Sequence, residues 1–180
     1  MENVKITIAL IVAVLLQWTL RNVAEPFVYI DFPLIVVVYV ALQRDAWTAL
    51  LVGTVAGLLI DAPSGGLIGA GGFSKTLTAY LVYLLATRVN LENPLIRIPV
   101  LAAATVIDGT IYFFWQRSLG SAPSAPYVQT ISYNVIGTTI AGTFVLYMLK
   151  SVFSPRGSQS RQFASRRRGA KRSTSFLKRR

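Results

Sequence analysis

The chain has 180 residues, of which 53% are hydrophobic and 14% are charged, and its mean hydropathy is +0.54. A soluble domain of this length does not need so many apolar residues, so the composition indicates an integral membrane protein. The chain contains no cysteine and no histidine, which excludes disulfides, thiol catalysis, zinc sites built from these residues and histidine general bases. We therefore expect no catalysis and no cofactor.

The net charge of +11 lies in the C-terminal part of the chain. From Lys150 onward there are eleven basic residues and no acidic residue, whereas the preceding residues include seven basic and seven acidic side chains. We therefore predict two regions, a transmembrane domain over residues 1–150 and a disordered basic cytoplasmic tail over residues 151–180.

The basic cluster of the tail is typical of segments that bind anionic lipid beside a membrane. An acidic face of a cytoplasmic partner is the second interpretation. Nucleic acid comes third, and we expect none among the partners, because no aromatic residues accompany the arginines to stack on bases. The tail residues expected to bind lipid or a partner are Arg166, Arg167, Arg168, Lys171 and Arg172.

Six apolar segments are expected to form an all-α membrane domain. They cover residues 4–20, about 32–42, about 46–60, 67–86, 98 to about 115, and 128–149. The first is long enough to cross or nearly cross about 30 Å of hydrocarbon at about 1.5 Å per residue. A cleaved signal peptide is the alternative, but no small-residue cleavage site follows near Arg21 and more apolar segments do.

The second and third segments are short for spanning helices. Either they begin earlier, at about residues 27 and 43, or they lie in a thinned region of the bilayer or form a re-entrant hairpin. With both termini in the cytoplasm, the inner side holds Lys5, Arg44, Arg88, Arg97 and the tail, and the outer loops hold only Arg21 and Arg117. This distribution follows the positive-inside rule, so we expect a multi-pass protein with both termini cytoplasmic.

The third segment carries small residues four positions apart, including Gly53 and Gly57. Such a stripe lets another helix approach closely. Packing within the bundle is the main interpretation, and contact with a partner's transmembrane helix is the alternative.

Asp61 ends the third segment and precedes a turn that contains Gly65 and Gly66. An Asp before a turn often binds backbone amides, and here it could also cap the fourth segment. Gly69 and Gly72 then give the start of that segment a bare surface, suited to helix crossing or to a partner. The glycines lack the spacing of a nucleotide-binding loop. We expect this region, from Gly53 to Gly72, to be a packing or docking surface.

Lys75 and Asp108 are ionisable residues inside apolar segments, where an unpaired charge is costly. Each lies eight residues from the expected outer end of its segment. Because neighbouring segments run antiparallel, the two side chains reach the same depth, about 12 Å from the outer surface. We therefore predict a buried interaction between them, which either fixes helix register or forms part of an ion or ligand site.

Two stretches together resemble the rod shape-determining protein MreD family: "IDFPLIVVVYVAL" at residues 30–42 and "GTVAGLLIDAPSGGLIGAGGFSKTLTAYLV" at residues 53–82. The similarity extends over about residues 5–150 and does not include the basic tail. It implies a noncatalytic membrane component of bacterial cell-wall elongation, located in the cytoplasmic membrane and required for rod shape. The implied partners are MreC and, through it, MreB, RodA and a transpeptidase.

Members of that family are also similar in fold to the substrate-binding membrane subunits of energy-coupling-factor transporters, which place six helices around an outward-facing pocket. This second likeness implies two competing functions. In a vitamin or small-molecule transporter subunit, Lys75, Asp108, Tyr112 and Asn134 would line the pocket. In a carrier of lipid-linked precursors, a groove with one buried cation would suit a polyprenyl phosphate.

Overall fold

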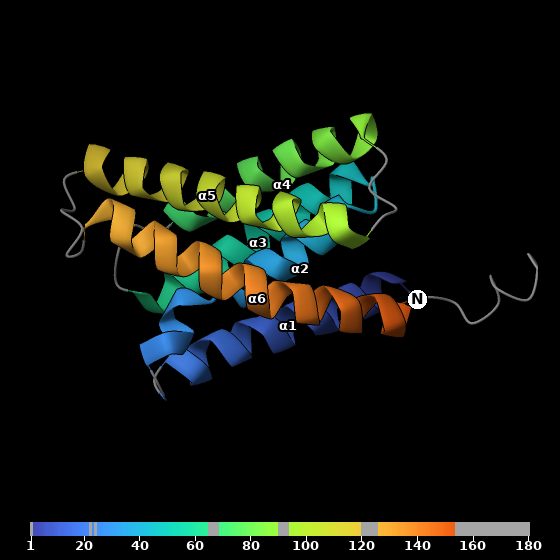
Figure 1. Cartoon of the computed structure of the whole chain (residues 1–180), viewed down its shortest axis with the longest axis horizontal. Helices are drawn as coiled ribbons and strands as arrows, with labels where there is room; N and C mark the ends of the chain where they lie inside the picture. The colour runs from blue at the N-terminus through green and yellow to red at the C-terminus, as the bar shows by residue number, and fades with distance from the viewer. Residues whose placement is uncertain are drawn as a thin grey trace, which may run out of the picture. The chain divides into compact units, whose positions relative to one another are not determined.

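The computed structural model describes residues 2–21, 23, 25–64, 69–89, 94–119 and 126–153. Throughout these residues the regular secondary structure is helical (Figure 1). The elements are α1 (Glu2–Arg21), η1 (Glu25–Tyr29), α2 (Phe32–Ala41), α3 (Ala46–Asp61), η2 (Ala62–Ser64), α4 (Ala70–Arg88), α5 (Pro94–Ser118) and α6 (Tyr127–Phe153). The expectation of six α-helices is therefore confirmed for the described part of the chain.

The observed helices follow the apolar segments, but α5 begins at Pro94 rather than residue 98 and α6 ends at Phe153 rather than residue 149. The fourth segment was expected to begin at residue 67, but α4 begins at Ala70, and Gly69 before it has a φ of 104°. Glycine readily adopts this left-handed conformation, so the helix starts after it. Lys75 is consequently the sixth residue of its helix.

The chain divides into two units, Met1–Tyr147 and Met148–Arg180. The first contains α1 to α5 and most of α6. The disordered tail was predicted to begin at residue 151, but α6 continues to Phe153, so the first three residues of that range are helical. The rest of the predicted tail, with Arg166, Arg167, Arg168, Lys171 and Arg172, lies outside the described residues.

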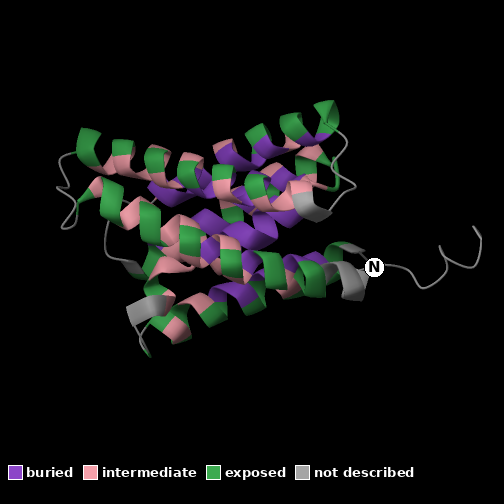
Figure 2. Cartoon of the chain, viewed as in Figure 1, coloured by how far each residue is buried: buried purple, intermediate pink, exposed green. Residues whose placement is uncertain are grey.

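The short helix α2 forms the core of the first unit. Every residue from Pro33 to Ala41 is buried, and α1, α3, α4 and α5 all contact this helix. Because α2 is apolar on every side, other helices can cover it on every side without burying an unpaired polar side chain, which suits it to the central position. Figure 2 shows the buried residues concentrated in the interior, with exposed residues on the outer helices.

By length and composition, three helices in the described part could cross a membrane: Asn3–Arg21, Ile96–Ser118 and Tyr127–Met148. Two further apolar helical stretches, Phe27–Ala41 and Ala46–Asp61, are shorter. Many large apolar side chains on the outer helices are exposed, among them Val4, Ile8 and Ile11 of α1 and Ile136, Ile140 and Phe144 of α6. Exposed apolar surface of this extent is typical of helices that face lipid.

Candidate functional site

The second apolar stretch is a broken helix. Residues 27–29 belong to the 3-10 helix η1, Ile30 and Asp31 are not helical, and α2 begins at Phe32. Asp31 is the N-cap of α2, and Pro33 occupies its first turn. Proline has no N–H to donate and a fixed φ, so it suits the first turn of a helix and favours a new start here.

Side chains from distant parts of the chain bind the backbone at this break. The Asp31 N–H donates to Thr138 Oγ1 of α6 at 3.0 Å, and the Phe32 N–H donates to Gln17 Oε1 of α1 at 3.0 Å. The Asp31 carboxylate itself accepts from the Leu34 N–H at 2.9 Å. Because a buried N–H without a partner is costly, these contacts allow the helix to break inside the bundle. They also attach α1 and α6 to the start of α2.

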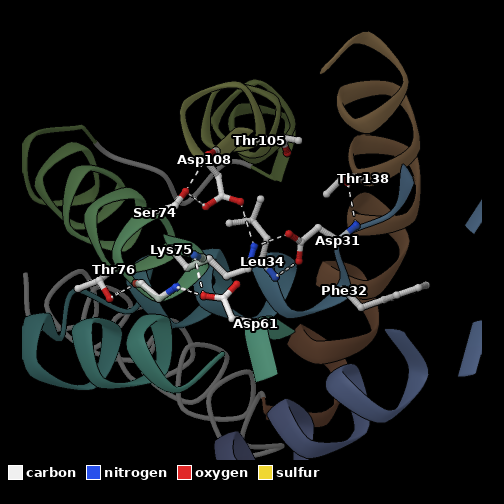
Figure 3. Close-up of polar contacts among 12 residues, drawn as sticks. Asp31, Phe32, Leu34, Asp61, Ser74, Lys75, Thr76, Thr105, Asp108 and Thr138 are labelled. Carbon is white, nitrogen blue, oxygen red and sulfur yellow. Dashed lines mark hydrogen bonds and ion pairs between the residues drawn. The ribbon is translucent and has the colours of Figure 1, made fainter. Parts of the chain in front are cut away.

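The break also supplies Asp31, one of the two carboxylates of a charged cluster around Lys75. Lys75 of α4 is 4% exposed, and its Nζ lies 2.9 Å from Asp108 Oδ2 of α5. Lys75 Nζ also donates to Asp31 Oδ2. The Ser74 hydroxyl donates to Asp108, both to its carboxylate and to its backbone carbonyl at 2.7 Å. Figure 3 shows these side chains converging from α2, α4 and α5.

The charges of this cluster are nearly balanced. One ammonium group faces two carboxylates, so the side chains alone carry one excess negative charge when all are ionised. The N-terminus of α2 adds a partial positive charge, equivalent to roughly +0.5, beside the Asp31 carboxylate that caps it. A buried ion pair stabilises only when its remaining polar groups are also bonded, and Ser74 and the Leu34 N–H supply those bonds. The cluster therefore holds α2, α4 and α5 in one fixed arrangement.

A second carboxylate binds the start of α4. Asp61, the last residue of α3, is 3% exposed. Its Oδ2 accepts from the N–H groups of Gly69 and Gly71, each at 2.9 Å, and of Gly72 at 3.4 Å. The N-cap residue of α4 is a glycine without a capping side chain. Asp61 replaces that missing cap from the preceding helix, and its negative charge faces the positive end of α4.

The glycines near Asp61 bring α3 and α4 into direct backbone contact. A Cβ atom built on Gly57 would lie 2.2 Å from the carbonyl oxygen of Gly71, and one built on Gly53 would lie 2.9 Å from that of Lys75. A Cβ on Gly71 would lie 2.4 Å from Asp61 Oδ1. No real side chain tolerates such distances, so only glycine fits at the crossing. The expected glycine surface is thus covered by α4 of the same chain.

A comparison with known protein families identifies the family of this chain. Residues 2–153 match the family model described as rod shape-determining protein MreD. The chain belongs to the MreD family. No curated protein and no solved structure matches it, so the expected likeness to energy-coupling-factor transporter subunits stays a prediction.

The predicted site residues of this MreD chain fall into three groups. Lys75 and Asp108 come together as a pair, and Asp61 binds the backbone at the start of α4. Gly53 and Gly57 lie in the helix crossing, and Gly72 lies beside it, where a Cβ would be 3.3 Å from the Leu58 side chain. Gly69 supplies the left-handed turn before α4. Gly65 and Gly66 lie outside the described residues.

Sequence reasoning missed Asp31 of this MreD chain, the second partner of Lys75. A signal for it exists, since an Asp followed two positions later by Pro is typical of a helix start. Here that signal falls inside the apolar stretch Phe27–Ala41, where a helix start implies a break in the helix and a carboxylate beside it. Thr138 and Gln17, which bind the break, carry no comparable sequence signal.

Proposed function

We propose that this MreD chain is a noncatalytic scaffold of the bacterial cell-wall elongation complex, located in the cytoplasmic membrane with both termini in the cytoplasm. The family determines rod shape and belongs to the MreBCD shape system. In the proposal the chain assembles directly with MreC, a protein with one transmembrane helix, and through it with MreB, RodA and a transpeptidase. The basic tail adds contact with anionic lipid.

The observation that supports a scaffold is how the buried charges are used. Lys75 binds two carboxylates, and Asp61 binds three backbone N–H groups. In both cases a charged group of one helix holds another helix in place. Catalysis would instead require a nucleophile or base presented to a substrate. The arrangement favours a rigid bundle whose outer surface is recognised by another protein.

The docking face that we propose for MreC is the outward surface where α3 and α4 cross. The glycines of that crossing are covered, but the adjacent side chains of Val55, Leu58 and Phe73 are 45%, 42% and 49% exposed. Close backbone contact makes this surface rigid, so the surface itself would lose little conformational freedom when a partner helix binds.

A paired substitution tests the proposed face. The double variant Leu58→Ala, Phe73→Ala should accumulate in membranes but lose co-purification with MreC in mild detergent, and cells that depend on it should become round. The control is Ile140→Ala, Phe144→Ala on α6, whose side chains are 69% and 67% exposed. This control should keep both MreC and rod shape. Loss of MreC only in the α6 variant would move the docking face to α6, and normal rods with no MreC recovered from any variant would contradict the scaffold.

A substrate-binding subunit of a transporter is the second candidate, and the broken helix favours it. Transporters often bind substrates and ions at the ends of discontinuous helices near the middle of the membrane. In this chain the Asp31, Phe32 and Leu34 N–H groups at the break already have partners within the bundle, which argues for the scaffold. Recovery of ATPase subunits and a bound small molecule with the purified protein would favour transport. Recovery of a bound polyprenyl phosphate would favour the carrier of lipid-linked precursors.

A further inference from the structure

The connection between α2 and α3 carries an unpaired cation, and the first turn of α3 carries an exposed tryptophan. Arg44 is exposed, and no acidic side chain among the described residues forms an ion pair with it. Trp47, three residues later, is 78% exposed, which is the largest exposure among the large apolar side chains of the described part. Arg44 lies in the short connection between α2 and α3, and Trp47 is the second residue of α3.

The backbone of Arg44 is in an unusual conformation. Its φ is 66°, and it is the only described residue other than glycine with a positive φ. Helices commonly end with a residue in this left-handed conformation, and glycine is usually found there because it has no Cβ to clash. An arginine is strained at this position. The fold itself therefore gains nothing from arginine over glycine, and the guanidinium group needs another explanation.

The neighbouring acid does not neutralise Arg44 directly. The Asp45 carboxylate caps α3 by accepting from the Thr48 hydroxyl and from the Thr48 N–H at 3.4 Å. The hydroxyl, and then the N–H, hold the pKa of the Asp45 carboxyl below its usual value of 3.8. Asp45 is therefore ionised at neutral pH, with its carboxylate bonded to α3. Arg44 is left to bind a negative group from outside the bundle.

The position of the turn between α2 and α3 indicates which kind of negative group binds Arg44. Two adjacent charged residues cannot lie in hydrocarbon, so a turn that joins two apolar helices must lie at the level of the lipid headgroups. Tryptophan favours the same boundary. At this level the abundant anions are lipid phosphates, which a guanidinium binds through paired hydrogen bonds.

We propose that Arg44 and Trp47 form a binding site for the headgroup of an anionic phospholipid, with the Arg44 guanidinium on the phosphate and the Trp47 ring at the acyl boundary. A lipid with net negative charge binds better than a zwitterionic one, because the choline cation of the latter opposes the guanidinium. One basic residue near an anionic surface corresponds to about fivefold enrichment of anionic lipid, from roughly 1 kcal/mol per residue.

Local fluorescence quenching tests this site, because the chain has three tryptophans. In the full-length variant Trp18→Phe, Trp115→Phe, only Trp47 remains. The protein is reconstituted in phosphatidylcholine vesicles that contain an equal mole fraction of brominated phosphatidylglycerol or brominated phosphatidylcholine. Phosphatidylglycerol should be enriched about fivefold near Trp47, as measured by its stronger quenching. Equal quenching by the two lipids would overturn the proposal.

Substitution of Arg44 distinguishes lipid binding at this site from the general attraction of anionic lipid to a basic protein. Arg44→Gly should abolish the preference while keeping the turn, since glycine relieves the left-handed strain. Arg44→Lys should keep most of the preference. The control is Arg88→Gln, which removes one exposed positive charge from the last turn of α4 and should leave quenching of Trp47 unchanged. A preference that survives Arg44→Gly, or that falls equally in Arg88→Gln, would contradict the proposal.

Discussion

Helices α4 and α6 are joined to the bundle in opposite ways. α4 contacts α3 backbone to backbone, with no room for a Cβ at Gly57, and Asp61 caps it from α3. α6 is joined through side chains such as Thr138. Only 17% of the most apolar stretch of α6 is buried, against 28% of the corresponding stretches of α1 and α5.

The difference shows what holds helices together in lipid. Apolar contact alone gives little advantage there, because lipid tails are as apolar as leucine. Close backbone approach and polar bonds therefore decide which helices are firmly attached. By this criterion α3, α4 and the cluster around Lys75 form the rigid part of the molecule, and α6 is its more adaptable part.

The largest expected effect comes from removing the cation at the centre of the rigid part. Lys75→Met should lower the free energy of unfolding by about 4 kcal/mol, because the buried Asp108 carboxylate and the half-buried Asp31 carboxylate would lose their shared partner. Unfolding by SDS titration in mixed micelles measures this change. The triple variant Lys75→Met, Asp31→Asn, Asp108→Asn should recover part of the loss. If the single variant were as stable as the wild type, the cluster would not hold the helices together.

A pair of glycine substitutions compares the two kinds of helix contact directly. Gly57→Ala should cost about 3 kcal/mol, because the new methyl group would meet the backbone of α4 at 2.2 Å. Gly109→Ala on α5 would place its methyl group 3.4 Å from Ile131 of α6, an ordinary contact. It should be neutral or stabilising by up to about 1 kcal/mol, since alanine favours helix. Equal destabilisation by both substitutions in the SDS titration would remove the proposed difference between α4 and α6.

The smallest expected effect concerns the attachment of α6. Thr138 accepts from the Asp31 N–H and donates to the Tyr29 carbonyl oxygen at 3.3 Å. Thr138→Val keeps the shape but removes both bonds, so it should cost about 1 kcal/mol and increase hydrogen exchange at the Asp31 amide. Thr138→Ser keeps the hydroxyl and should retain protection of that amide. Unchanged exchange in the valine variant would show that α6 does not stabilise the helix break.

Much of the fold could be predicted because hydropathy is a local property of the chain. Segments expected at about residues 32–42 and 46–60 correspond to α2 (Phe32–Ala41) and α3 (Ala46–Asp61). The pairing of Lys75 with Asp108 could also be inferred, since two buried charges of opposite sign on adjacent antiparallel helices have few other partners. The later start of α4 could not, because it depends on the backbone conformation of Gly69.

The sequence by itself thus determined the helical class, the order of the helices, the MreD family and one buried ion pair. Only the tertiary structure decided that Asp31 completes that pair from 44 residues away, and that Thr138 binds the same break from 107 residues away. It also decided that α4 covers the glycines of α3. The physical reason is that hydropathy and helix-start signals act over a few neighbouring residues, whereas these contacts depend on which helix faces which.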